Sequence, residues 1–71
     1  MSVVSFFRYH VRLMVGELPT ATQFLTARSV ESAIREGEKI FQERWPFYDG
    51  FQILDTTRVI YRHTVVIRHL H

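Results

Sequence analysis

Arginines are the side chains of this 71-residue chain that best suit a binding function. Those in stretches of strand composition are Arg8, Arg12, Arg58, Arg62 and Arg68. A guanidinium group pairs with a carboxylate or a phosphate through two parallel N–H donors. We therefore expect a cationic surface that binds an acidic protein or a nucleic-acid backbone. The alternative is an ordinary sheet face that its charges keep soluble.

Aromatic and histidine side chains accompany these arginines. His10 stands between Arg8 and Arg12 in an alternating stretch, and a loop of aromatic residues surrounds Pro46. Aromatic residues and arginine dominate interface hot spots, although such a loop could instead cover the end of the domain's own core. The candidate partner-binding residues are Arg8, His10, Arg12, Arg58, Arg62, Trp45 and Tyr48.

The sequence gives little support to catalysis. It has no cysteine nucleophile, no Ser, His and Asp residues in the order of a catalytic triad, no glycine-rich phosphate loop and no metalloprotease motif. Its carboxylates at Glu31, Glu36, Glu38 and Glu43 share an expected helix surface with basic neighbours, which is typical of a solvated face. We expect a protein that is not an enzyme and needs no cofactor.

Three histidines gather near the C-terminus, at His63, His69 and His71. His69 and His71 would point to the same side of a strand, but a structural zinc site usually has four ligands. No Cys or acidic residue nearby completes such a set. We expect surface or terminal histidines and no metal.

Size and composition indicate one globular domain, at residues 1–71. The chain is 46% hydrophobic and 14% aromatic, far from the composition of a disordered protein. The first apolar run is interrupted by Arg8, His10 and Arg12, so we expect no signal peptide. No run approaches the roughly 18 apolar residues of a membrane span. With no cysteine, the expected location is the reducing cytoplasm.

Two extended stretches begin the domain. Phe7 to Val15 alternates apolar and polar residues, which predicts a strand over residues 6–15. After a loop at residues 16–19, a second strand is expected over 20–28, with Phe24 as its core anchor. The short connection predicts a β-hairpin.

A helix is expected over residues 30–45. Ser29 is a suitable N-cap, and Pro46 disfavours helical geometry at the residue before it. Gly37 would let the helix lie close to the sheet. One apolar stripe contains Val30, Ala33, Ile34, Gly37, Ile40, Phe41 and Trp45.

The rest of the chain returns to strand composition, at residues 51–62 and 64–70. The segment 55–57 is either a bulge or a turn that splits the first stretch, and 64–70 is either a fourth strand or an extension. Phe51, Ile53, Val59 and Tyr61 are expected on one side. The prediction is an α+β fold in the order β-β-α-β, or β-β-α-β-β. One helix covers one face of a small, mostly antiparallel sheet.

Several features favour a protein partner over a nucleic acid. The chain has a single lysine, and the exposed side of its helix is acidic, which would repel phosphates. Phe7, Tyr9 and Phe24 are expected in the core, not as stacking platforms. A nucleic-acid-binding accessory domain remains the alternative. A structural subunit that self-associates through a strand edge, for instance as a homodimer, is the third.

The stretch from Phe7 to Arg62 resembles small bacteriophage proteins that switch off host machinery. The segment Phe24-Leu25-Thr26-Ala27-Arg28-Ser29-Val30-Glu31-Ser32-Ala33 runs from strand to helix as in the phage inhibitors of bacterial RNA polymerase. An aromatic helix end and the strand Gly50-Phe51-Gln52-Ile53 follow. Similar segments occur in other phage and plasmid proteins, including inhibitors of CRISPR complexes.

This resemblance implies an inhibitor or adaptor that occupies an acidic surface of a host complex, in the host cytoplasm. In the family, arginines of the third strand contact the polymerase, and Arg58 and Arg62 would inherit that role. The chain differs in its longer loop after the helix, its more basic hairpin and its additional C-terminal segment.

Overall fold

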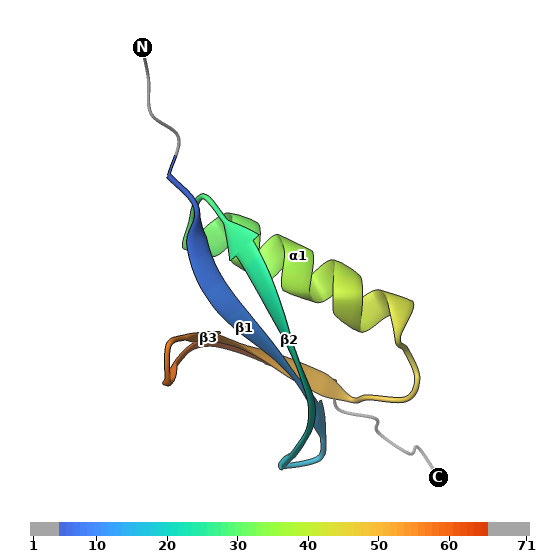
Figure 1. Ribbon diagram of the computed structural model, residues 1–71. Coiled ribbons are helices and arrows are strands. Elements are labelled where there is room, and N and C mark those ends of the chain that lie inside the picture. The colour runs from blue at the N-terminus through green and yellow to red at the C-terminus, as the bar shows by residue number, and fades with distance from the viewer. Residues whose placement is uncertain (1–4, 66–71) are drawn as a thin grey trace, which may run out of the picture.

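The computed structural model describes residues 5–65. Four strands form one antiparallel sheet in the order β2-β1-β3-β4, and the helix packs on one face of it (Figure 1). The α+β prediction, with β-β-α-β-β order, is confirmed. The elements are β1 (Phe7–Val15), β2 (Leu18–Ala27), α1 (Val30–Glu43), β3 (Gly50–Asp55) and β4 (Arg58–Thr64).

The core lies between α1 and the two central strands. Alternation along β1 turns Tyr9, Val11 and Leu13 toward the helix, and all three are buried. From β3 come Phe51 and Ile53, which are 1% and 0% exposed. Burying each such side chain contributes about 1.5–3 kcal/mol. The helix adds Ala33 and Phe41.

The helix begins and ends close to where the sequence predicts. The Ser29 hydroxyl accepts a hydrogen bond from the Ser32 N–H at 3.2 Å, which satisfies one of the free donors of the first turn. Gly37 lies directly over β3: a Cβ there would collide with Ile53 Cδ1 and lie 3.1 Å from the Phe51 ring. The close approach expected at Gly37 is therefore confirmed.

A tight turn joins the two strands of each hairpin. Gly16 and Glu17 connect β1 to β2, so the turn is shorter than the predicted loop, and Gly16 takes a φ of 61° that favours glycine. Thr56 and Thr57 connect β3 to β4, which shows that 55–57 is a turn. β4 ends at Thr64, and most of the strand or extension expected over 64–70 lies outside the described residues.

Phe24 is not a core residue, contrary to the prediction. It is 64% exposed and pairs with His10, so it lies on the side of the sheet away from α1. Phe7, also expected in the core, is 55% exposed. On the helix side, β2 presents the exposed Gln23 and the smaller apolar residues Ala21, Leu25 and Ala27. Short side chains leave room for α1 to approach β2 closely, whereas a ring would hold it away.

The prediction that Val59 lies on the same side of the sheet as Phe51, Ile53 and Tyr61 is also wrong. The pairing of β3 with β4 shifts register between Ile53 and Leu54, so that Ile53 opposes Tyr61 but Leu54 opposes Val59. One additional residue, Ile60, lies on the β4 side of this bulge. Val59 therefore shares the face of Leu54, and not that of Phe51 and Ile53.

Candidate functional site

The face of the sheet opposite α1, called the open face here, gathers most of the predicted binding residues. Directly opposed residues of an antiparallel pair share a face, so the register identifies its members. The described chain places no helix or strand over this face (Figure 1). The open face comprises Arg8, His10, Arg12, Met14, Thr22, Phe24, Thr26, Gln52, Leu54, Val59, Arg62 and Thr64.

A row of polar residues crosses the open face, and we call Arg12, Gln52 and Arg62 the arginine row. Arg12 opposes Gln52 across β1 and β3, and Gln52 opposes Arg62 across β3 and β4. Arg12 Nη1 donates a hydrogen bond to Gln52 Oε1 at 3.3 Å. Gln52 is only 5% exposed although no element covers it, so neighbouring side chains of the open face must shield its amide. Its bond to Arg12 fixes one guanidinium; Arg12 is half-buried and Arg62 is exposed.

A second row, next to the first, is aromatic and apolar. Phe24, His10, Leu54 and Val59 follow one another across β2, β1, β3 and β4. The ring of His10 meets that of Phe24 edge-on, with centroids 4.7 Å apart. Leu54 is buried, while Phe24 and Val59 remain exposed at the two ends. The open face therefore alternates a cationic row with an apolar one.

The structure brings Arg8 and Arg12 to the open face with Arg62, but it separates Arg58 from them. Arg8 lies on the same side of β1 as His10, opposite Thr26 of β2. Arg58 opposes Asp55 at the tip of the β3–β4 hairpin, on the side of the sheet that α1 covers. Both Arg58 and Arg62 belong to β4 and not to the third strand, where the family resemblance would put the contacting arginines.

One end of the arginine row borders a hollow of about 510 Å³. Its walls come from β1, β3, β4 and the β1–β2 turn, and Arg62 and Gln52 line it together with the carboxylate-bearing Glu17. The hollow gives the open face a concave region in which a side chain of a partner can be surrounded. The remaining lining residues are Met14, Gly16 and Thr64.

Asp49, which the sequence analysis did not single out, holds this end of the sheet together. Both of its carboxylate oxygens accept from the Gly16 N–H, at 2.9 and 3.0 Å. Its backbone N–H donates to the Met14 carbonyl at 3.0 Å, and its carbonyl accepts from the Val65 N–H at 2.7 Å. Asp49 thus ties the β1–β2 turn to the start of β3 and the end of β4. An acid just before the strand glycine, Gly50, was the available signal.

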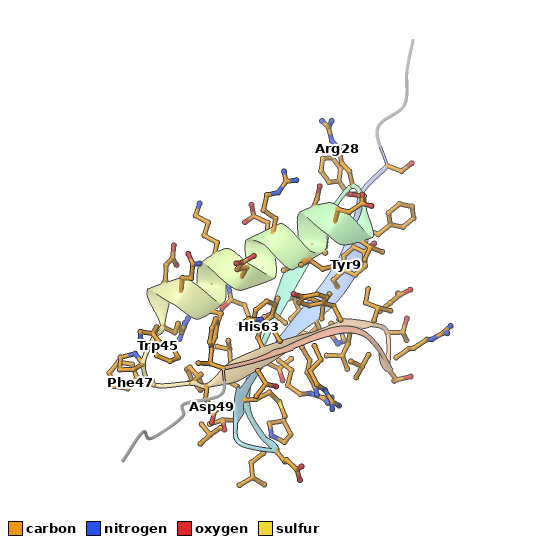
Figure 2. The ribbon with its side chains drawn as sticks, turned by 180° about the vertical axis from the view of Figure 1, so that it is seen from behind. Tyr9, Arg28, Trp45, Phe47, Asp49 and His63 are labelled. Atoms are coloured by element: carbon orange, nitrogen blue, oxygen red, sulfur yellow. The ribbon has the colours of Figure 1, made fainter. Side chains whose placement is uncertain are left out.

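The aromatic loop after α1 lies away from the open face. Trp45 is 44% exposed and contacts Phe41 edge-on at 5.8 Å, while Tyr48 packs against the core. Figure 2 shows Trp45 and Phe47 together at the C-terminal end of the helix. Phe47 is 80% exposed. Trp45 and Tyr48 therefore form a region separate from the arginine row.

His63 lies on the helix side of the sheet. Its ring lies 5.7 Å from that of Phe41 and 5.6 Å from that of Phe51, and Figure 2 shows it below α1. His69 and His71 lie outside the described residues. Within residues 5–65 no group of three His, Cys, Asp or Glu side chains is placed to hold a metal ion.

Charge is divided between the two sides of the molecule. Each charged strand position of the open face is an arginine, whereas the helix on the other side carries Glu31, Glu36, Glu38 and Glu43 with only Arg35 and Lys39 among them. The other acids are Glu17 in the β1–β2 turn, Asp49 just before β3, and Asp55 at the end of β3 on the helix side of the sheet. An acidic ligand that approaches the open face therefore meets no opposing carboxylate along the strands.

Comparisons with models of known families, with characterised proteins and with solved structures find no match for this chain. Across the part of the chain that the structure describes, no helix is both long and apolar enough to cross a membrane.

Proposed function

We propose that the protein is a non-catalytic binding domain whose open face occupies an acidic surface of another protein. The observation that carries this proposal is the arginine row: a half-buried and an exposed arginine flank a buried amide, on a face without acids along its strands. Guanidinium groups held in place lose less entropy on pairing with carboxylates than free ones do.

The surroundings of the row favour a protein partner. Leu54 and Met14 provide an apolar floor beside the arginines, and Phe24 adds an exposed ring. A mixture of arginine with apolar and aromatic side chains is typical of the centre of protein interfaces. A phosphate backbone would be repelled by the acidic helix, and the net charge of +2 is small for a nucleic-acid-binding domain.

The biological setting we propose rests on the resemblance to phage proteins. A domain of this size acts by covering a surface stoichiometrically, as an inhibitor or adaptor of a host complex such as RNA polymerase or a defence complex. No pocket chemistry is required for such a role, since the effect comes from excluding or recruiting another macromolecule.

The experiment is affinity capture from bacterial lysate with the full chain as bait, with and without nuclease. We expect a defined protein complex that survives nuclease treatment and is lost with Arg12→Ala plus Arg62→Ala. The matched control is Arg35→Ala plus Lys39→Ala, which removes the same charge from the outer side of α1 and should leave capture intact. Equal capture by both double variants would contradict the proposal.

Arg58→Ala separates two versions of the proposal. If the binding surface follows the open face, this substitution at the hairpin tip should leave capture unchanged. If the role follows the arginines that the resemblance suggests, Arg58→Ala should weaken capture as much as Arg62→Ala does. The two single variants, compared at equal concentration, distinguish these outcomes.

A nucleic-acid partner is the second candidate, and one observation favours it. Phe24 is exposed on the cationic face, next to His10, instead of lying in the core. Single-stranded nucleic acids bind sheets through aromatic rings on which bases stack, with arginines along the backbone. Loss of the captured material on nuclease treatment, and salt-dependent binding of an oligonucleotide that Phe24→Ala weakens, would select this candidate.

A further inference from the structure

The two edges of the sheet differ in how they are protected. An edge strand presents unpaired N–H and C=O groups, and proteins usually guard them with charges, prolines or bulges. β4 has such guards, namely Arg58, Arg62 and the register shift at Leu54. β2 carries no charged residue over its ten positions, and its two guards, Pro19 and the register shift at Thr20, both lie near its start. Among residues 5–65, no strand pairs with the outer edge of β2, and residues 21–27 of this edge carry no guard.

A shallow hollow follows this edge. Its volume is about 410 Å³, and it is lined by Phe24, Leu25 and Thr26 of β2 together with Arg8 of β1. The hollow therefore adjoins β2 and the neighbouring part of β1. Phe24 also leaves 64% of its surface exposed there. The edge thus offers apolar contact as well as backbone hydrogen-bonding groups.

We propose that β2 pairs with β2 of a second copy of this chain, antiparallel, about a two-fold axis perpendicular to the sheet. The two sheets would become one, with four strands from each copy and both helices on the same side. Both open faces would then lie side by side and double the cationic surface. The inference stands apart from the proposed function, since the chain alone is sufficient to form this pairing.

The chemistry of β2 favours a copy of itself over a foreign segment. The strand has no charge with which to select an acidic or a basic peptide. The β2 strand of a second copy has the same length, and its threonines favour the strand conformation. Because neither strand is charged, no like charges would oppose each other across the axis. A symmetric pairing of this kind is isologous and closes at two subunits.

Symmetry limits the register. The axis keeps each residue on its own face of the sheet. A residue of one copy therefore opposes either the same residue of the second copy or one that lies an even number of positions away in the sequence. The register that places Phe24 opposite Phe24 of the second copy buries the one aromatic side chain of β2, which is exposed in the single chain. Thr22 then opposes Thr26 of the second copy, and the same set of pairs repeats on the other side of the axis.

Sedimentation of the full chain over a wide concentration range tests the pairing. We expect the mass to rise from that of the 8.5 kDa monomer to twice that value. Phe24→Lys, which adds a guard to this edge, should keep the chain monomeric. Val59→Lys is the matched control, because Val59 ends the same row at the other edge, and it should leave the dimer intact. A chain that stays monomeric at every concentration, or a dimer lost only with Val59→Lys, overturns the proposal.

A single cysteine tests the register, because the chain contains none. Directly opposed residues have Cα atoms roughly 4.5–5.5 Å apart, within the roughly 4.4–6.8 Å that a disulfide requires. We expect Phe24→Cys to form a covalent dimer on mild oxidation much faster than Thr22→Cys, since Thr22 opposes a different residue. Cross-linking of Thr22→Cys or Val59→Cys at the same rate as Phe24→Cys would contradict this register.

Discussion

The two faces of the sheet carry residues of opposite character from the same strands. Toward α1, β1 presents Tyr9, Val11 and Leu13, all buried in one apolar cluster. Toward the open face it presents Arg8, His10 and Arg12. Because neighbouring residues of a strand point to opposite sides, this one nine-residue strand supplies apolar side chains to the core and polar side chains to the open face.

The difference separates stability from recognition. The helix-covered face holds the apolar contacts that a chain of 71 residues needs, since small domains bury a limited fraction of their surface. On the open face only Met14, Gln52 and Leu54 are buried, so its remaining positions are free to suit a ligand. Substitutions on the two faces should therefore change different measurements.

The largest expected effect is that of Phe51→Ala compared with Phe24→Ala. Phe51 is 1% exposed between Phe41 and Tyr61, so its loss leaves a cavity and should lower the free energy of unfolding by about 3–5 kcal/mol. Phe24 lies on the open face, and the same substitution there should cost less than about 1 kcal/mol.

Urea denaturation of both variants measures the contrast. If Phe51→Ala is too unstable to purify, Phe51→Leu provides a milder comparison on the same scale. Equal losses for Phe24→Ala and Phe51→Ala would show that the open face also belongs to the core, and the separation of the two faces would fail.

Gly37→Ala tests the closeness of α1 to β3. The added methyl group would collide with Ile53 and press on Phe51, so the helix must move outward. Overpacking of this kind costs about 1–3 kcal/mol, against a gain of up to about 1 kcal/mol in helix propensity. We expect a net decrease in the unfolding free energy, measured by thermal denaturation, and a change within about 0.5 kcal/mol for Glu36→Ala on the exposed side. An increase in stability for Gly37→Ala would contradict the close packing.

The sequence predicts the helix-covered face better than the open one, for physical reasons. Ser29, the apolar stripe and Pro46 determine α1 locally, and alternation determines β1. The facing of β2 depends on its register with β1, and the large Phe24 suggested the wrong side because a ring usually marks the core. The register shift at Leu54 depends on two strands at once. It places Arg58 and Arg62 on different sides, although a spacing of four in an uninterrupted strand would keep them together.

Asp49→Ala tests the connection between the β1–β2 turn and the start of β3. The substitution removes two contacts to the Gly16 N–H, which is exposed to water, so the cost should be about 1 kcal/mol. Asp49→Asn keeps a carbonyl acceptor and should recover part of this loss. Amide exchange of Gly16, followed by NMR, should accelerate in Asp49→Ala more than in Asp49→Asn. Unchanged exchange at Gly16 in both variants would show that the carboxylate does not hold the turn.

The smallest effect on stability is expected for Arg12→Ala plus Arg62→Ala, the pair that should affect binding most. Removing Arg12 leaves Gln52 Oε1 without its protein donor, but the same truncation opens the amide to water, which replaces that hydrogen bond. The unfolding free energy should therefore fall by less than about 1 kcal/mol. Thermal denaturation of the double variant, beside Arg35→Ala plus Lys39→Ala, measures this. A loss comparable to that of Phe51→Ala would mean that the arginine row holds the sheet together, and a partner would no longer be needed to explain its presence on the open face.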